Sequence, residues 1–388
     1  MRIALATSSY EPHVGGVEEH VRNVARVLVE RGHEVVVWTI DREGGAAVRE
    51  VDGIEVRDLP APLPARSPSG LLRFALRAPW AWARWRGAFR SHRPDLIHVQ
   101  CFGPNGTYSR VLAKRTGTPL VITSHGETLA DDAGVFTRSR FAIGSLRAGL
   151  AAAAAVTGCS QVVLDDLEAR FGLDPALGQV VFNGIDLVEP AGTAPPGATG
   201  RFVAAVGRLQ PVKGFDLLVE AFARADLPSD VRLVIGGDGP ELDGLRNEAV
   251  RLGVGERLVL PGRLDRGTVG ALWAAAGVGV VPSRFEAFGI SALEIWRAGS
   301  ALIATTRGGP AEFVRDGVDG ILVDPLDVEE LARALRELLS DPARASLLGV
   351  AGAERVRSFT WDRAVDAYES VYRDVAGAHA ETAETDIT

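Results

Sequence analysis

The sequence predicts two doubly wound α/β domains, each with a parallel sheet that helices cover on both faces. Short segments rich in Val, Ile and Leu alternate with helical patterns along most of the 388 residues. These segments are apolar throughout rather than at every second residue, which is typical of strands buried on both faces. A stretch rich in Pro, Gly and Thr at 189–201 interrupts the alternation, which then restarts, so we expect the linker there.

The first half of the chain opens with a strand and an amphipathic helix. The apolar run at 2–7 predicts the strand, and the segment 16–33 follows it with three valines and Leu28 at helical spacing. Further strands are predicted by short apolar runs at 34–39, 53–58, 95–100, 119–124 and 179–184. Together these elements predict a first domain over residues 1–189.

The second half repeats the alternation of strands and helices. Its strands are predicted by apolar runs at 202–207, 232–237, 257–262, 278–283, 301–306 and 320–325. Helical patterns follow these runs, and the clearest, at 326–339, places Leu331, Leu335 and Leu338 on one face. We expect a second domain over 190–360, a helix over 361–376 that crosses back to the first domain, and a disordered polar tail at 377–388.

Composition and charge exclude several classes of protein. The chain has 42 basic and 50 acidic side chains, a net charge of −8, which disfavours general attraction to nucleic acid. Its two cysteines, Cys101 and Cys159, cannot form a disulfide framework, and the first apolar run is too short for a signal peptide. The longest uncharged apolar stretch, near 148–158, is shorter than the roughly 20 residues of a membrane span. We therefore expect a cytoplasmic protein with no nucleic-acid partner.

Two cations follow the first strand of the second domain. Arg208 and Lys213 lie between that strand and the next predicted helix, and Lys213 is one of only two lysines in the chain. Cations at the carboxyl end of a strand, beside a helix N-terminus, favour a diphosphate. The alternative is two surface charges that flank a turn.

Two glutamates follow another strand of the second domain. Glu286 lies in the loop, Phe288 and Gly289 form a turn, and a helix is predicted to begin near Ile290, with Glu294 in its first turns. Backbone N–H groups at a helix start attract an anion, whereas carboxylates accept hydrogen bonds from sugar and ribose hydroxyls. The pattern therefore indicates a nucleotide sugar, and the alternative is two ordinary surface glutamates.

These motifs resemble those of the retaining GT-B glycosyltransferases of glycosyltransferase family 4, a group that includes phosphatidylinositol mannosyltransferases. The resemblance covers nearly the whole chain, through GGVEEH at 15–20, GRLQPVKG at 207–214, GGDGPE at 236–241, EAFGISALE at 286–294, GGPAE at 308–312 and FTWD at 359–362. It implies two Rossmann-like domains that face each other across a cleft. The second domain would bind a UDP- or GDP-sugar, and the first would bind a small-molecule or lipid-linked acceptor.

The resemblance also assigns roles to individual residues of the second domain. Arg208 and Lys213 would clamp the donor diphosphate, Glu286 would hold sugar hydroxyls, and Glu294 would bind the ribose. Further donor contacts are implied at Arg263, Leu264, Phe288, Gly289 and Ile290. A tryptophan at 296, where the family usually has small residues, is expected near the site.

In the first domain, the resemblance points to a glycine pair and a histidine. Gly15 and Gly16 would let the backbone approach a phosphate, and His125 would be the active-site histidine that faces the donor sugar. A simple helix-entry turn and a structural histidine are the alternatives. The resemblance implies retention at the anomeric carbon without a metal ion or cofactor, and we expect a front-face substitution because no carboxylate stands out as a nucleophile.

Two other classes of function stay open. A sugar-nucleotide epimerase shares the two-domain architecture and would isomerise its donor without any acceptor. A nucleotide-binding module without turnover is the other, although the complete set of Arg208, Lys213, Glu286 and Glu294 argues against it. A dinucleotide-dependent oxidoreductase is disfavoured, because GGDGPE is followed by Leu242 where the fingerprint has a third glycine.

A strongly basic segment of the first domain bears on the acceptor. Residues 66–115 carry ten basic side chains against the single acid Asp95, and the stretch 71–93 mixes arginines with aromatic residues. Trp82, Trp85 and Phe89 are helically spaced, after an expected helix break at Pro79. Such a helix can bind an anionic membrane surface. The alternative is a solvated helix whose tryptophans pack inward.

Overall fold

The structure, a computed structural model, describes the chain apart from residues 14, 42–46, 66, 130–133, 189–190 and 386–388, and apart from the side chains of 380–385. It divides into two compact units. The first unit comprises Met1–Gly184 and Trp361–Thr388, and the second comprises Ile185–Thr360. The boundary expected at 189/190 falls on residues outside the described part, and the chain passes between units at 184/185 and 360/361.

The first unit is built on an eight-stranded sheet with the order β3-β4-β2-β1-β5-β6-β7-β8. Its strands are β1 (Arg2–Thr7), β2 (Glu34–Ile40), β3 (Val48–Val51), β4 (Ile54–Leu59), β5 (Leu96–Gln100), β6 (Leu120–Ser124), β7 (Ala155–Gly158) and β8 (Gly178–Val180). All neighbours pair in parallel except β3, which runs antiparallel to β4. The short strands β3 and β7 were not predicted from the sequence.

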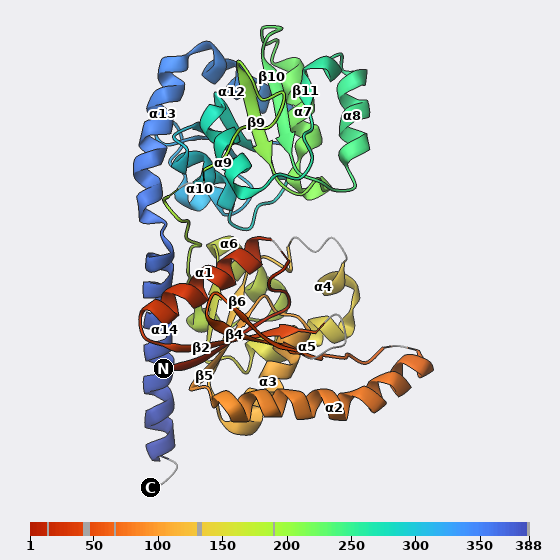
Figure 1. The fold of residues 1–388 in the computed structure, drawn as a ribbon, viewed down its shortest axis with the longest axis vertical. Coiled ribbons are helices and arrows are strands. Elements are labelled where there is room, and N and C mark those ends of the chain that lie inside the picture. Colours follow the sequence, from red (N-terminus) through yellow and green to blue (C-terminus); the bar gives the residue numbers. More distant parts are fainter. Residues whose placement is uncertain (14, 42–46, 66, 130–133, 189–190, 386–388) are drawn as a thin grey trace. The chain divides into compact units, whose positions relative to one another are not determined.

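Helices cover both faces of this sheet (Figure 1). They are α1 (Gly16–Glu30), α2 (Pro68–His92), α3 (Pro104–Thr116), α4 (Val135–Arg138), α5 (Arg140–Leu150), α6 (Gln161–Asp166) and α14 (Trp361–Thr385), with a π-turn at Leu167–Phe171 and a 3-10 turn at Pro175–Leu177. Alternate residues of β1 show the two sides, since Ile3 and Leu5 pack towards α1 and α14 while Ala4 and Ala6 pack towards α2 and α3. The predicted doubly wound arrangement is confirmed.

Helix α14 belongs to the first unit although it follows the second unit in the chain. Its buried residues include Trp361, Tyr368 and Tyr372, which pack with α1 and the central strands in one apolar cluster. The helix continues to Thr385, through most of the segment 377–388 that we expected to be a disordered tail. Val375 is the last described residue of the helix that is buried, and residues 376–379 are exposed.

The second unit is built on a six-stranded, all-parallel sheet with the order β11-β10-β9-β12-β13-β14. Its strands are β9 (Phe202–Val206), β10 (Arg232–Gly236), β11 (Leu258–Val259), β12 (Val278–Val281), β13 (Ala301–Thr305) and β14 (Ile321–Val323). Its helices are α7 (Phe215–Arg224), α8 (Leu242–Arg251), α9 (Arg266–Ala275), α10 (Ile290–Arg297), α11 (Pro310–Phe313), α12 (Val328–Ser340) and α13 (Pro342–Arg355), with 3-10 turns at Pro211–Lys213, Gly255–Arg257 and Val356–Ser358. A large apolar cluster beneath α7 and α12 forms its main core.

Helix α2 differs from the prediction in two ways. It runs unbroken through Pro79, because Ala75 and Pro79 both face solvent and water can bond the carbonyl that proline leaves without a partner. Three of its aromatic residues, Trp82, Trp85 and Phe89, pack inward, whereas Trp80 is exposed. Trp85 is fully buried and donates its indole N–H to the Pro60 carbonyl at 2.9 Å. These three rings therefore follow the inward-packing alternative, whereas membrane contact through the rest of α2 stays a prediction.

No helix among the described residues is both long enough and apolar enough to cross a membrane.

Candidate functional site

The candidate site of the second unit lies where its parallel strands end. Because these strands all run in one direction, the loops after them gather at one edge of the sheet. Backbone hydrogen bonds join these loops, since Leu209 N donates to Asp238 O at 2.9 Å and Gly237 N donates to Gly262 O at 2.8 Å. Three loops thus form one platform. They contain the motifs GRLQPVKG, GGDGPE and PGRL, the last at residues 261–264.

Glycine makes this platform possible. Gly237 has a φ of +142°, and a Cβ there would lie 1.8 Å from the carbonyl oxygen of Gly207. Gly239 approaches Leu209 in the same way. The GGDGPE motif therefore supports the loop that contains Arg208, a role that its weak dinucleotide-binding signal did not suggest.

Lys213 and Glu286 meet at this edge of the sheet. Lys213 ends the 3-10 turn after β9, and its Nζ lies 2.7 Å from Oε2 of Glu286. The same carboxylate oxygen accepts a hydrogen bond from the Ser283 hydroxyl at 2.8 Å. Both charged side chains are partly exposed, at 26% for Lys213 and 13% for Glu286, so each remains accessible to a ligand.

A second ion pair fixes the loops that hold these two residues. The Arg284 guanidinium binds the Asp216 carboxylate through two contacts, of 2.7 and 2.6 Å. Arg284 also donates to the carbonyl of Pro211 at 2.7 Å. Bidentate pairing of this kind is geometrically specific, so the loop of Lys213 and the loop of Glu286 are held in register.

The GGPAE motif holds the backbone of Glu286. Glu286 N donates to the Arg307 carbonyl at 3.0 Å, and Gly309 N donates to the Glu286 carbonyl at 2.8 Å. Gly308 has a φ of +123°, and a Cβ there would lie 2.0 Å from the Glu286 carbonyl oxygen. Only glycine at 308 allows this close pairing.

Helix α10 begins beside Glu286. Gly289 is its N-cap residue with a φ of +98°, Ile290 is its first residue, and Phe288 is buried against Phe313. The backbone N–H groups of the first turn therefore lie at the edge of the sheet where the Lys213–Glu286 pair lies. A helix start of this kind favours negative charge.

Two residues of α10, Glu294 and Trp296, have different environments. Glu294 is half-buried, and its Oε2 accepts a hydrogen bond from the Trp273 indole N–H at 3.3 Å. Trp296 is fully buried and donates to the Asp319 carbonyl at 2.6 Å. The expectation that Trp296 lies near the site is wrong, because the helical periodicity turns it into the core.

The remaining predicted donor residues lie on the same platform. Arg208 and Arg263 are exposed, in the loops after β9 and β11. The Leu264 side chain packs against Gly236, and a Cβ on Gly236 would lie 2.6 Å from Leu264 Cδ1. The structure therefore brings all the predicted residues of the second unit to one edge of its sheet.

In the first unit, Gly15 and Gly16 lie at the start of α1. Gly15 is the N-cap and Gly16 the first helical residue. A Cβ on Gly15 would lie 2.6 Å from a carboxylate oxygen of Glu18, so this acidic side chain folds over the helix start. A phosphate at this position would have to displace it.

His125 follows β6, at the carboxyl edge of the first sheet. Its Nε2 lies 2.8 Å from the Oε1 atom of Gln100 at the end of β5. Its ring also packs edge to face against His20 of α1, with ring centroids 4.6 Å apart. Burial lowers the pKa of His125 to about 4, so the ring is neutral at pH 7.

Comparison with known proteins identifies the family. The family model described as "Glycosyltransferase Family 4" matches residues 14–189, and the model described as "Glycosyl transferases group 1" matches residues 195–355. A D-inositol 3-phosphate glycosyltransferase of Acidothermus cellulolyticus is 33% identical, over 99% of this chain and 91% of its own. The chain belongs to the group 1 glycosyltransferases.

Other proteins that are similar to this glycosyltransferase have different names. A glycogen synthase of Mycobacterium tuberculosis is 29% identical, over 96% of this chain and 94% of its own. Among solved structures, HepE of Anabaena in complex with UDP has a TM-score of 0.74 at 22% identity, over 96% of this chain and 100% of its own. The last comparison shows the GT-B fold, which agrees with the fold class expected from the sequence.

Sequence reasoning missed a carboxylate that supports His125 of the glycosyltransferase. Glu127 accepts hydrogen bonds from His125 N at 2.8 Å, Phe102 N at 2.8 Å and the Ser124 hydroxyl at 2.9 Å. Burial raises the pKa of Glu127, and these hydrogen bonds oppose the rise. Glu127 thus ties the loop after β6 to the loop after β5. Its place two residues after His125 was visible in the sequence, but its partners were not.

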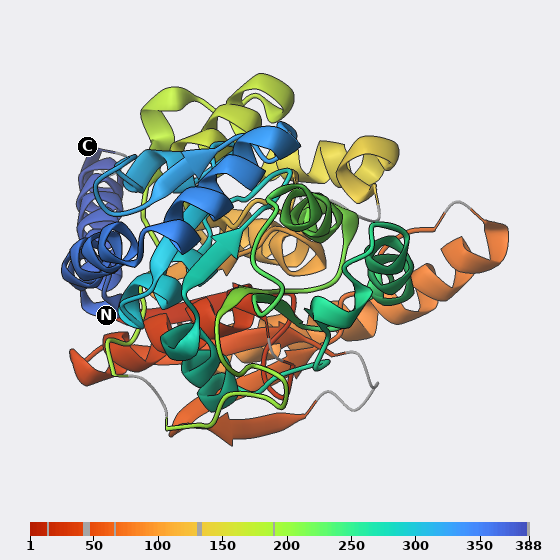
Figure 2. The same cartoon turned by 90° about the horizontal axis from the view of Figure 1, so that it is seen from above.

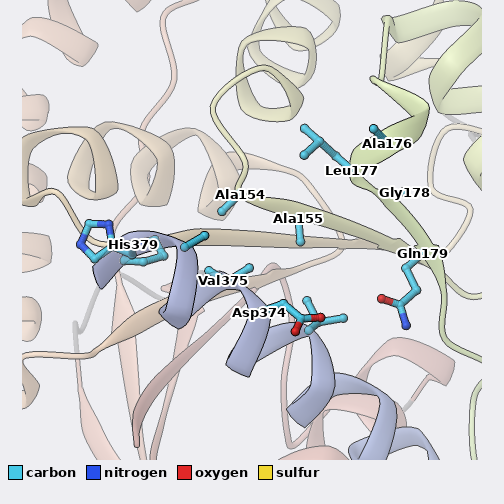
Figure 3. Close-up of a pocket in the computed structure, with 12 residues that line it drawn as sticks. Ala154, Ala155, Ala176, Leu177, Gly178, Gln179, Asp374, Val375 and His379 are labelled. Carbon is cyan, nitrogen blue, oxygen red and sulfur yellow. The ribbon is translucent and has the colours of Figure 1, made fainter. Parts of the chain in front are cut away.

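One cavity of the first unit lies at the opposite edge of the sheet from His125. It has a volume of about 420 Å³ and lies between α14 and the amino ends of β7 and β8, lined by Ala155, Gly178, Gln179, Asp374 and Val375 among others (Figure 3). In parallel sheets ligands bind at the opposite, carboxyl ends. We therefore do not assign this cavity to the reaction. Among the described residues, no group of three or more His, Cys, Asp or Glu side chains is placed to hold a metal ion.

Proposed function

We propose that this glycosyltransferase transfers a sugar from a UDP- or GDP-sugar to an acceptor hydroxyl, with retention at the anomeric carbon and without a metal ion. The observation that carries the proposal is the 2.7 Å pair of Lys213 and Glu286 at the carboxyl edge of the second sheet, beside the start of α10. Lys213 supplies a positive charge for the diphosphate, and Glu286 accepts hydrogen bonds from sugar hydroxyls. The relative solved with UDP supports a nucleotide donor.

Catalysis then depends on stabilising the leaving nucleoside diphosphate. Negative charge develops on the phosphate oxygens as the bond to the sugar breaks, and Arg208, Lys213 and the N–H groups of α10 would stabilise it. Glu286 is already held by Lys213 and Ser283, which suits a binding role better than nucleophilic attack. We therefore propose a front-face substitution, with His125 facing the donor sugar. A trapped covalent sugar–enzyme adduct would contradict it.

A donor screen tests the proposal. Purified protein in EDTA is incubated with a panel of nucleotide sugars, and mass spectrometry measures release of the free nucleoside diphosphate. We expect slow hydrolysis of one UDP- or GDP-sugar in the wild type and none in Lys213→Ala. Isomerisation of a donor without release would indicate the epimerase alternative. Absence of both release and thermal stabilisation by UDP or GDP would refute the donor site.

We further propose that α2 docks the enzyme on an anionic membrane surface, where a lipid-linked acceptor would lie. Part of α2 projects from the rest of the first unit (Figure 1, Figure 2). Leu72, Leu76 and Trp80 are exposed at helical spacing and form an apolar ridge, whereas Ala81, Trp85 and Ala88 are buried. Arg73 and Arg77 lie beside this ridge, and no acidic residue lies within the helix. Apolar side chains flanked by arginines suit the boundary between acyl chains and anionic headgroups.

Vesicle binding tests this surface. Leu76 and Leu347 are equally exposed, at 72% each, but Leu347 lies on α13 of the second unit. We expect Leu76→Glu to abolish co-sedimentation with phosphatidylglycerol vesicles and Leu347→Glu to leave it unchanged. Equal binding by both variants, or wild-type binding to neutral vesicles at the same strength, would refute membrane docking through α2.

A further inference from the structure

Two polar side chains point into the core from β5. His98 and Gln100 alternate with Ile97 and Val99, so both lie on the face of the sheet that α14 covers, and both are fully buried. Burying an imidazole and an amide is unfavourable unless their polar atoms find hydrogen-bond partners. The partners that they find lead directly to His125.

The contact between Gln100 and His125 determines where the His125 proton lies. Oε1 of Gln100 lies 2.8 Å from Nε2 of His125. An amide carbonyl oxygen only accepts, so the hydrogen must come from the imidazole. With the Gln100 amide in this orientation, His125 is protonated at Nε2 and carries its lone pair at Nδ1.

His98 favours this orientation of the amide. Nε2 of Gln100 lies 3.3 Å from Nδ1 and 3.2 Å from Nε2 of the His98 ring. The amide nitrogen is therefore almost equally far from both ring nitrogens. In the plane of the ring it would clash with the carbon between them, so it lies over the face of the ring. That face attracts an N–H group and repels a carbonyl oxygen, which excludes the flipped amide.

Helix α14 holds the His98 ring in turn. Its two nitrogens lie 2.6 Å from the Tyr372 hydroxyl and 2.6 Å from the Thr123 hydroxyl. Both ring edges are therefore occupied, and only the face is left for Gln100. The hydrogen-bonded chain runs from Tyr372 on α14 through His98 and Gln100 to His125.

We propose that Gln100 is a positioning residue that holds the His125 imidazole as the tautomer protonated at Nε2. The lone pair at Nδ1 then accepts a hydrogen bond from a sugar hydroxyl of the donor or acceptor. This second step rests on the proposed glycosyl transfer, whereas the tautomer itself does not.

Nuclear magnetic resonance of the ¹⁵N-histidine-labelled full chain tests the tautomer without any substrate. Long-range ¹H–¹⁵N correlations distinguish the two neutral forms, and the His125 signals are assigned by their loss in His125→Gln. We expect the Nε2-protonated form in the wild type. The Nδ1-protonated form, or a mixture of both, would overturn the proposal even if no Gln100 variant folded.

Two isosteric variants separate positioning from packing. Gln100→Met removes the acceptor, whereas Gln100→Glu keeps an acceptor but replaces the NH₂ group with a second carboxyl oxygen, which makes the side chain titratable. We expect Gln100→Met to lose the single tautomer and to lower kcat by at least about tenfold with an unchanged donor KM, with a smaller kcat loss in Gln100→Glu. The exposed Gln179 provides the control, as Gln179→Met should match the wild type.

The outcomes keep the two proposals distinguishable. If Gln100→Met and Gln100→Glu behave alike, Gln100 acts by packing and the positioning role is refuted. If the wild type has the Nε2-protonated ring but turns over no donor, the proposed function fails and the tautomer assignment stands. If Gln100→Met loses the tautomer but keeps its kcat, the tautomer has no role in transfer.

Discussion

The two units carry different kinds of chemistry at the carboxyl ends of their sheets. All seven histidines of the chain belong to the first unit, and residues 185–360 contain none. The side chains that contact the His125 ring, Gln100 and His20, are buried and uncharged, whereas those around Lys213 are charged and partly exposed. We therefore expect added salt to weaken mainly the interactions of the second site, because salt screens partly exposed charges. Acid should destabilise mainly the first unit, because its buried imidazoles resist protonation in the folded state.

The largest effect should come from removing the cation of the second unit. We expect Lys213→Ala to lower the rate of donor cleavage at least about 100-fold, because a fixed charge at the leaving phosphates is lost. The other lysine of the chain, Lys114, is exposed on α3 of the first unit and provides the control. Steady-state rates with the donor found by the screen measure both variants. A similar loss of rate in Lys114→Ala would show that the effect is not specific to the cation of the second unit.

A glycine variant should weaken the second unit alone. Gly237→Ala combines a φ of +142° with a clash at the Gly207 carbonyl, so we expect it to destabilise the unit by about 2–4 kcal/mol. Gly244 lies within α8 with open space around it, so Gly244→Ala should stabilise by up to about 1 kcal/mol. Pulsed hydrogen exchange in urea, resolved by unit, measures both. Loosening of residues 1–184 to the same extent would contradict the division into two units.

Acid should weaken the first unit instead. Burial lowers the pKa of His98 to about 3 and of His125 to about 4, from an unfolded value of 6.5. The unfolded chain therefore binds more protons than the folded chain below pH 6.5, and stability is lost as the pH falls. Each histidine should contribute a slope of about 1.4 kcal/mol per pH unit between pH 6 and 5.

The same pulsed exchange in urea, at pH 7 and pH 5, measures this loss. The exposed His13 offers a control, since His13→Gln should keep the slope of the wild type. If residues 185–360 lost as much stability as the first unit, the buried histidines would not be its cause.

The smallest effect should come from the support of Glu294. Trp273→Phe keeps an aromatic side chain but removes the indole N–H group that donates to Glu294 at 3.3 Å, so we expect a rise of a few-fold in donor KM, worth about 1 kcal/mol or less. Trp296→Phe loses a hydrogen bond of 2.6 Å to the Asp319 carbonyl in the core. It should lower thermal stability and leave the donor KM unchanged. A KM change in both variants would place Trp296 at the site after all.

Local patterns predicted the second unit better than the first. Arg208, Lys213, Glu286 and Glu294 lie in short motifs directly after strands, and parallel strands necessarily bring such loops to one edge. The links around His125 depend on pairs far apart in the chain, since His98 and Tyr372 are 274 positions apart. A periodic sequence pattern cannot predict such a long-range contact. The two polar residues within the buried strand β5 were nevertheless visible in the sequence and indicated that they need hydrogen-bond partners.

The errors in α2 have a related physical cause. A helix with arginines and aromatic residues on different faces can turn either side towards the core, and the neighbours decide which. The stacking of Trp85 on Tyr108, with ring centroids 5.4 Å apart, decides it here. Tyr108 lies on α3, which follows the next strand, and its place could not be read from α2 itself.

The return of α14 to the first unit bears on the order in which the protein can fold during synthesis. The second unit, residues 185–360, is a continuous piece of chain, and all of its core residues have been made before Trp361 emerges from the ribosome. The first unit begins earlier but must wait for Tyr368 and Tyr372, which close its apolar cluster and bond its buried histidines. Until then His20 and His98 lack their tyrosine partners. The unit that starts first in the chain is therefore the one that finishes last.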